Sequence, residues 1–281
     1  MVIEYAPLED ELGDILDKAM RHACLTEQAL SKRARVSAEK IRDAIDYRYD
    51  LSTEEIGRLA AALELNETGL TALAQSRYPL PEIAGLPFCL YPLRFPHGIG
   101  VANAYIVADC CHSTGLLFDT GTDYGLLHRL WPKRIKKADS VFITHGETEH
   151  VGGLRGLLAE QGRLSVFCPE GKCVESATAL GEGSKLSFGH LEVRALKTPG
   201  HCESHNCYVV TSTAAPSAPP LLISGDTLFA GSTGTAFFCQ QKLTDSLHRM
   251  FEQLPENTVV APGHGPLTTI KNERRYNPFV V

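Results

Sequence analysis

The chain concentrates groups that bind metal ions in one short segment, HGETEH at residues 145–150. Two imidazoles and two carboxylates lie there, between the apolar stretch 141–143 and the glycine-containing turn 151–154. Side-chain packing does not account for such a density of charged and ionisable groups. Imidazole together with carboxylate suits zinc, iron or manganese. The segment therefore predicts part of a metal site that contains His145, Glu147, Glu149 and His150.

Three further residues of the same kinds stand in glycine-containing loops downstream. His201 follows T-P-G, Asp226 follows S-G, and His264 follows P-G, each after an apolar run. Glycine permits tight turns, and loops at strand ends are where chemistry is usually placed. We expect these three side chains to complete the metal site. Four histidines lack this framing and are expected not to be ligands: His97, His112, His190 and His205.

Short apolar runs bounded by Gly, Pro, Asp or Asn predict strands through the second part of the chain. They cover 104–107, 115–118, 140–143, 164–167, 207–210, 221–223 and 258–260. Helices are predicted between them at 123–131, 152–161, 171–179 and 242–253. Strands interleaved with helices indicate an α/β domain with layered sheets, here over 88–281.

Residues 1–76 read instead as a small all-α domain. Apolar residues fall at helical spacing over 12–19 and 56–63. Thr26, Ser37, Ser52 and Asn66 are placed to cap helices, and Glu55 completes a capping box with Ser52. The segment 77–87 contains three prolines and a glycine and is predicted to be the linker.

Residues 26–65 resemble the helix-turn-helix domain of the phage-repressor and Xre type, in which the third helix, here about 37–46, enters the DNA major groove. The charge disfavours that role, because residues 1–80 contain ten Lys and Arg against fifteen Asp and Glu. Phosphate neutralisation supplies much of DNA affinity. DNA is therefore an unlikely partner that the sequence does not exclude. The alternative is a domain that mediates a homodimer or covers the rest of the protein.

Five motifs in order resemble the metallo-β-lactamase superfamily over about 100–281. They are FDTG (118–121), THxxxxHxGG (144–153), TPGH (198–201), GDTLF (225–229) and PGHGP (262–266). Within the superfamily, the last two segments look most like glyoxalase II. The resemblance implies an αββα sandwich with metals at one edge. It implies a first metal on the 145, 147 and 201 positions, a second on 149, 150 and 264, and Asp226 as the bridge.

Two residues depart from the usual first motif, H-x-H-x-D-H. Glu147 replaces the second histidine, as in the H-x-E-x-D-H motif of flavodiiron and related di-iron proteins, and Glu149 replaces the aspartate. A carboxylate is a harder donor than imidazole, so the cofactor is expected to be two iron or manganese ions, with zinc possible. Because Glu149 is longer than aspartate, a shifted or empty second position is an alternative.

These observations favour a metal-dependent hydrolase of a thioester or ester, a small-molecule substrate. Asp226 and Glu149 are the candidates for proton transfer. The cations Lys271, Arg274 and Arg275 follow the last ligand and are candidates for binding an anionic part of the substrate, as is Lys242. One alternative is a di-iron oxygen-binding or oxidoreductase protein. The other is a metal-domain sensor fused to a DNA-binding regulator.

The composition agrees with an ordinary globular protein. The 281 residues are 43% hydrophobic and 21% charged, with a net charge of −6, which argues against a membrane-surface role. The acidic start is unlike a signal peptide, and no apolar run approaches the length of a membrane span, so a cytoplasmic location is expected. The nine scattered cysteines are expected to be reduced thiols, mostly buried.

Overall fold

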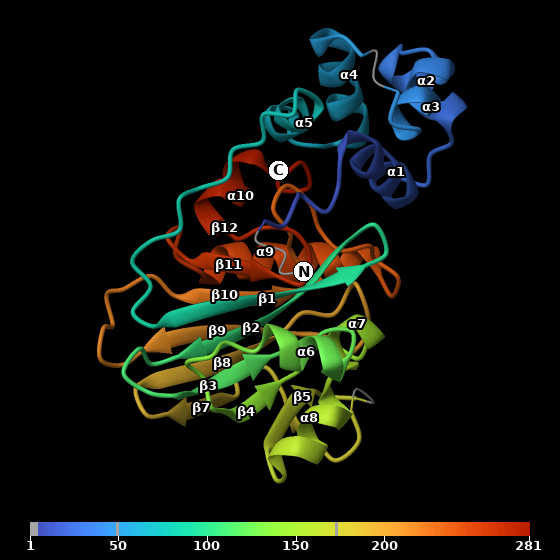
Figure 1. The fold of residues 1–281 in the computed structure, drawn as a ribbon. Helices are drawn as coiled ribbons and strands as arrows, with labels where there is room; N and C mark the ends of the chain where they lie inside the picture. The colour runs from blue at the N-terminus through green and yellow to red at the C-terminus, as the bar shows by residue number, and fades with distance from the viewer. Residues whose placement is uncertain (1–4, 49–50, 172–173) are drawn as a thin grey trace.

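The computed structural model describes residues 5–48, 51–171 and 174–281. Two six-stranded sheets face each other, helices cover their outer faces, and five further helices gather at the N-terminal end (Figure 1). This arrangement confirms the predicted α/β class with preceding helices.

Each sheet combines antiparallel and parallel pairs. The first sheet has the order β1 (Cys89–His97), β2 (Gly100–Ala108), β3 (Thr114–Phe118), β4 (Lys137–Phe142), β5 (Ser165–Pro169) and β6 (Thr178–Leu180). The second has the order β12 (Thr268–Thr269), β11 (Val259–Pro262), β10 (Leu221–Gly225), β9 (Asn206–Ser212), β8 (Leu191–Lys197) and β7 (Lys185–Phe188). Strands β3 to β6 are parallel, as are β10 and β11, and the remaining neighbours are antiparallel.

Three hydrophobic clusters hold the layers together. Phe118, Phe142 and Tyr208 are fully buried between the two sheets, where their rings contact one another. A second cluster joins the first sheet to α6 (Tyr124–Leu130) and α8 (Leu154–Gln161), and a third joins the second sheet to α9 (Gln240–Gln253). Apolar burial on both faces of both sheets makes the sandwich a rigid support for the loops at its edges.

The helices predicted at 123–131, 152–161 and 242–253 are confirmed as α6, α8 and α9. The short helices α7 (Thr148–Val151) and α10 (Ile270–Tyr276) add to them. The helix predicted over 171–179 is wrong: apart from 172–173, which lie outside the described residues, this stretch forms turns and the start of β6. Gly171 and Ser176 have positive φ values of 113° and 63°, which break a helix.

Four of the five N-terminal helices described begin at the predicted caps, and α1 begins after Glu11. The five are α1 (Leu12–His22), α2 (Glu27–Ala34), α3 (Ala38–Ile45), α4 (Thr53–Leu63) and α5 (Glu67–Ala74). The side chains of Thr26, Ser37, Ser52 and Asn66 each accept a backbone N–H of the following helix. The helices pack around a hydrophobic core of their own, which we call the bundle core.

Helices α2 and α3 are joined by the three-residue turn 35–37, as in the helix-turn-helix resemblance. The cations of α3 pair with carboxylates of α4 and α2, however. Lys40 Nζ lies 3.0 Å from Glu55 Oε1, and Arg42 Nη2 lies 2.6 Å from Glu27 Oε2. These ion pairs leave little positive charge on α3 for phosphate, which disfavours the regulator alternative.

The cysteine prediction needs a correction, because Cys89 and Cys110 form a disulfide. The antiparallel pairing of β1 with β2 places Cys89 opposite Ala108, two residues before Cys110, and brings the two Cα atoms to 5.3 Å. Among the described thiols, Cys168 and Cys207 are buried, while Cys24 and Cys111 are exposed. In the described part of the chain, no helix has both the length and the apolar character that crossing a membrane requires.

Candidate metal centre

The strands that precede the predicted ligands end at one edge of the sandwich. Strands β8, β10 and β11 run in the same direction, so the loops that carry His201, Asp226 and His264 meet there. In the first sheet β4 leads to His145. Two hydrogen bonds join the sheets at this point, from Asn206 N–H to the Thr144 carbonyl (2.9 Å) and from the Tyr208 hydroxyl to the Ile143 carbonyl (2.7 Å).

All seven predicted ligands come together in two adjoining groups. The first contains His145, Glu147, His201 and Asp226, and the second contains Glu149, His150 and His264. In each group the ligand atoms lie within 4.8 Å of one another. The four histidines and Asp226 are buried, whereas the two glutamates are half-buried. The longer side chain at 149 therefore still reaches the second group.

Asp226 lies between the two groups. Its Oδ1 atom is 3.5 Å from His150 Nε2, and its Oδ2 atom is 3.4 Å from His264 Nε2 and 3.9 Å from His201 Nε2. The carboxylate thus contacts imidazoles of both groups, which is the position that a bridging ligand requires.

The imidazoles are fixed through Nδ1, so their Nε2 atoms point into the centre. Nδ1 of His145 lies 3.0 Å from Thr144 Oγ1, and Nδ1 of His150 lies 3.1 Å from an Asp119 oxygen. The carbonyl oxygens of residues 235 and 101 lie 2.8 and 3.1 Å from Nδ1 of His201 and His264. Such outer hydrogen bonds are typical of histidines that bind metals.

Several buried polar atoms in the centre have no hydrogen-bond partner among the described residues: Nε2 of His145, His150 and His201, and Oδ1 of Asp226. Buried polar atoms normally have partners, because an unpaired one destabilises the fold. Imidazole nitrogen and carboxylate oxygen are atoms that coordinate divalent cations, and these four lie together at one edge of the sandwich. The residues present therefore fit a metal site.

Two residues around the ligands escaped the sequence-based prediction. Asp119 accepts hydrogen bonds from Thr144 N–H (2.8 Å) and Thr144 Oγ1–H (2.9 Å), in addition to its contact with His150. His205 is fully buried, and its Nε2 accepts the backbone N–H of Asp226 at 3.1 Å. His205 belongs to neither ligand group and orients the loop that carries Asp226.

Contacts within the centre lower the pKa of its carboxylate Asp226 and raise the pKa of the neighbouring imidazole of His264. Burial opposes ionisation of Asp226, but the nearby His264 and His150 hold its pKa well below the usual range. Burial likewise opposes protonation of His264, but Asp226 raises its pKa to about 9. The imidazoles of His145 and His201, 3.7 and 3.2 Å from the Glu147 carboxylate, hold the pKa of Glu147 low. Asp226 and Glu147 are thus in the anionic form that binds cations.

The segment before α1 reaches the same centre. Glu9 Oε2 lies 3.7 Å from His264 Nδ1, and burial raises the pKa of Glu9 to about 7. On the neighbouring hairpin, His97 Nε2 lies 3.4 Å from Glu149 Oε1. The outer surroundings of the second group therefore come from the N-terminal segment as well as from the sandwich.

A cavity of about 700 Å³ opens beside the first group, lined by His145, Glu147, Pro199, Cys202 and Lys242 among others. The predicted substrate-binding cations Lys271, Arg274 and Arg275 are not in its lining. Instead Arg274 Nη2 donates to the Phe251 carbonyl at 2.6 Å, and Arg275 lies over the Tyr276 ring. Burial raises the pKa of Cys202 to about 12, so its thiol is neutral.

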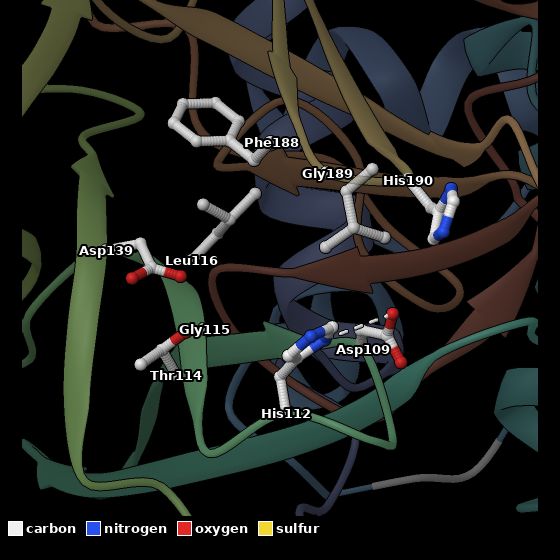
Figure 2. A pocket seen from close by; sticks show the side chains of 10 residues that line it. Asp109, His112, Thr114, Gly115, Leu116, Asp139, Phe188, Gly189 and His190 are labelled. Carbon is white, nitrogen blue, oxygen red and sulfur yellow. Dashed lines mark ion pairs between the residues drawn. The ribbon is translucent and has the colours of Figure 1, made fainter.

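A second cavity, of about 370 Å³, lies at the opposite ends of β4 and β8. Figure 2 shows Asp109, His112, Asp139 and His190 around it, with His112 Nδ1 3.2 Å from Asp109 Oδ2. Residues 112 and 190 are exposed, and the described residues form no metal-binding group at this end. His112 and His190, two of the four histidines predicted as non-ligands, thus lie far from the ligand edge.

Known proteins are similar to this chain in sequence and in fold. Residues 97–264, more than half of the chain, match the Metallo-beta-lactamase superfamily. A probable metallo-hydrolase of Bacillus subtilis is 28% identical over 66% of this chain and 96% of its own length. A hydroxyacylglutathione hydrolase of Dictyostelium discoideum is 30% identical, over 48% of this chain and 50% of its own.

A solved structure, TTHA1623 in a di-iron-bound form, has a TM-score of 0.55 and 28% identity, covering 67% of this chain and 99% of the other.

Proposed function

Since this chain belongs to the metallo-β-lactamase superfamily, we propose that it is a metal-dependent hydrolase of a thioester or ester. The observation that carries the proposal is the convergence of buried, unpaired Nε2 atoms and Asp226 Oδ1 at one edge of the sandwich. The relatives named metallo-hydrolase and hydroxyacylglutathione hydrolase support hydrolysis and the substrate class.

The two ligand groups suit two metal ions. In this proposal His145, Glu147 and His201 hold one ion, Glu149, His150 and His264 hold the other, and Asp226 contacts both. Three carboxylates among seven ligands favour iron or manganese over zinc. The di-iron form of TTHA1623 supports the same choice.

When bound, the metal ions would lower the pKa of a water molecule and polarise the substrate carbonyl. The protein holds Asp226 between the two groups in its anionic form, where it would serve as a proton acceptor. Glu149 has a proton-accepting neighbour of its own, because its Oε1 atom is 3.4 Å from His97 Nε2. His97 lies on the β1–β2 hairpin and can pass a proton toward solvent, since it is exposed.

A di-iron oxygen-binding or oxidoreductase protein is the second candidate. Glu147 favours it, because its carboxylate belongs to the first ligand group where superfamily hydrolases resembling glyoxalase II have an imidazole. Such a protein needs electrons from a donor, so its activity should depend on an added reductant, whereas hydrolysis should not.

Metal analysis and hydrolysis assays test the proposal together. Protein purified without added metal should contain about two iron or manganese ions per chain and should hydrolyse acyl-glutathione or generic thioesters. His145→Ala and Asp226→Ala should abolish turnover and lower metal content. Absence of turnover over a broad panel of esters and thioesters would reject the hydrolase. Stoichiometric zinc alone would reject the iron assignment.

A further inference from the structure

Two aromatic side chains stand exposed beside the first ligand group. Phe237 is 72% exposed and Phe238 is 41% exposed, although most large apolar side chains of the described chain are buried. The Phe237 ring contacts the His201 imidazole in a T-shaped arrangement, with ring centroids 5.4 Å apart. An apolar surface in direct contact with a proposed metal ligand is suited to an apolar part of a substrate.

One turn into α9, Lys242 provides a positive charge on the same side. Its Nζ atom lies 4.9 Å from the centroid of the Phe238 ring, and Lys242 lines the cavity together with His145 and Glu147. The other lysine of that cavity, Lys197, pairs with Glu170 at 3.2 Å. Among the described residues, Lys242 has no carboxylate within ion-pair distance, so its charge is available to a ligand.

The hairpin between β1 and β2 adds an apolar residue beside the second ligand group. Ile99 is fully exposed at the tip, two residues after His97, which contacts Glu149. Exposed apolar side chains therefore flank the ligands from two elements, the hairpin and the loop before α9. On the loop side, Lys242 adds a cation without an ion-pair partner among the described residues.

We propose that the substrate is an acyl ester or thioester with an apolar stretch that packs on Phe237 and a negatively charged group that pairs with Lys242. This inference rests on the hydrolase function proposed above. It deepens that function, because it assigns the recognition to α9 and its preceding loop and not to the terminal cations Lys271, Arg274 and Arg275.

Two matched esters test the inference: 4-nitrophenyl hexanoate and mono-4-nitrophenyl adipate, which have the same chain length and differ by a terminal carboxylate. Wild-type protein should have a KM for the adipate about fivefold lower, the upper range for an exposed ion pair. Lys242→Gln should remove this preference by raising the adipate KM to the value for the hexanoate. Phe237→Ser should raise both KM values by about tenfold through lost apolar contact.

Two further lysine variants control for general charge effects. Lys271→Gln tests the cation favoured by the sequence, and Lys137→Gln removes an exposed lysine at the far end of β4. Both should keep the adipate preference. If Lys242→Gln keeps it as well, or if Lys271→Gln loses it, the inference is wrong although the hydrolase function stands.

Binding measurements separate the inference from the proposed function. Titration calorimetry with the free carboxylates hexanoate and adipate measures their affinity for the protein as isolated and requires no turnover. If neither ester is hydrolysed, the proposed function is in question, but tighter binding of adipate to wild type than to Lys242→Gln would still support the recognition site. Equal binding of the two ligands by both proteins would overturn it.

Discussion

Asp119 fixes two separate parts of the proposed metal centre with one carboxylate. One oxygen accepts Thr144 N–H beside His145, and the other lies 3.1 Å from His150 Nδ1 and 2.9 Å from Thr144 Oγ1. The residue has a φ of +59°, an uncommon conformation for aspartate that turns the side chain inward. An outer carboxylate in this position orients the ring and increases its basicity.

Replacement of Asp119 by asparagine should therefore weaken metal binding without removing a ligand. The amide nitrogen would face His150 Nδ1 or Thr144, where a carboxylate oxygen now accepts, and the metal affinity should fall by about 10- to 100-fold. Competition with a chelator measures the change. Asp109→Asn, beside His112 at the far cavity (Figure 2), is the matched control and should have no effect. Unchanged affinity in Asp119→Asn would contradict this role.

The ligand positions could be predicted from sequence because each follows an apolar run and has a glycine close by. His201, Asp226 and His264 all have that local signal. Asp119 also follows an apolar run, with Gly121 close by, but its contribution, like that of His205, depends on which way a buried side chain turns. Asp119 belongs to the F-D-T-G motif, but only the three-dimensional contact with His150 shows what its carboxylate does.

At the scale of elements, helix α1 is connected to the loop that orients His201. Lys18 Nζ donates to the Thr233 carbonyl at 2.9 Å and pairs with Asp10 at 2.5 Å, and the Ser232 hydroxyl also donates to Asp10. Two residues further along, the Thr235 carbonyl lies 2.8 Å from His201 Nδ1. The side chains of Lys18 and Asp10 are mostly buried, so water screens this connection poorly.

Lys18→Met should consequently affect the first metal as well as folding. Loss of the buried partner of Asp10 should destabilise the protein by about 3 kcal/mol. The double variant Lys18→Met with Asp10→Asn should recover part of that loss in urea unfolding, because no unpaired charge remains. Both variants should retain less metal in chelator titration, since the Thr233 contact is absent. Full metal retention in the double variant would show that α1 has only a structural role.

Element prediction succeeded where local signals were strong. The capping residues of α2 to α5 and the apolar periodicity over 12–19 and 56–63 were sufficient for the N-terminal helices. Strand β1 had no such signal, because Pro92 and Pro96 interrupt it. Proline lacks a backbone donor and is tolerated on edge strands, and β1 is the edge of its sheet. A strand with two prolines is compatible with an edge position, and that position is known only once the sheet has assembled.

At the scale of the whole molecule, the bundle is attached to the C-terminal segment. Asn66 N–H donates to the Pro278 carbonyl at 2.8 Å, and Phe279 packs against the bundle core. Figure 1 shows α10 and the C-terminus directly below α5. Contacts between residues more than 200 positions apart produce no periodic pattern in the sequence. The sequence could therefore predict the N-terminal helices but not their packing against the C-terminal segment.

Glu273 joins these distant parts and provides a test of their coupling. Its buried carboxylate accepts from Tyr78 Oη and Thr268 Oγ1 through one oxygen and from Gly231 N and Asn277 Nδ2 through the other. In Glu273→Gln one carboxylate oxygen becomes an NH2 group, which faces groups that now donate to that oxygen. The change should destabilise the protein by about 2 kcal/mol. Urea unfolding measures this. A change below about 0.5 kcal/mol would show that the network contributes little.

The junction of bundle and C-terminus should also make stability depend on pH. His22 ends α1 and contacts the Phe279 ring at 5.6 Å, and burial, assisted by Lys18, lowers its pKa from 6.5 to about 4. Between these values the unfolded chain binds a proton that the folded chain does not. The stability that neutral His22 allows is therefore complete above pH 6.5 and is lost as the pH falls toward 4.

Urea unfolding of metal-free protein at pH 7.5 and 5 should reveal this proton linkage. Wild type should lose about 1–2 kcal/mol more than His22→Phe, which keeps a ring against Phe279 and cannot titrate. His112→Phe, at an exposed residue at the far end of the sandwich, controls for replacing a histidine by a ring that cannot titrate. Equal losses in wild type and His22→Phe would mean that water reaches His22 and that the bundle opens from the C-terminal segment in the folded protein.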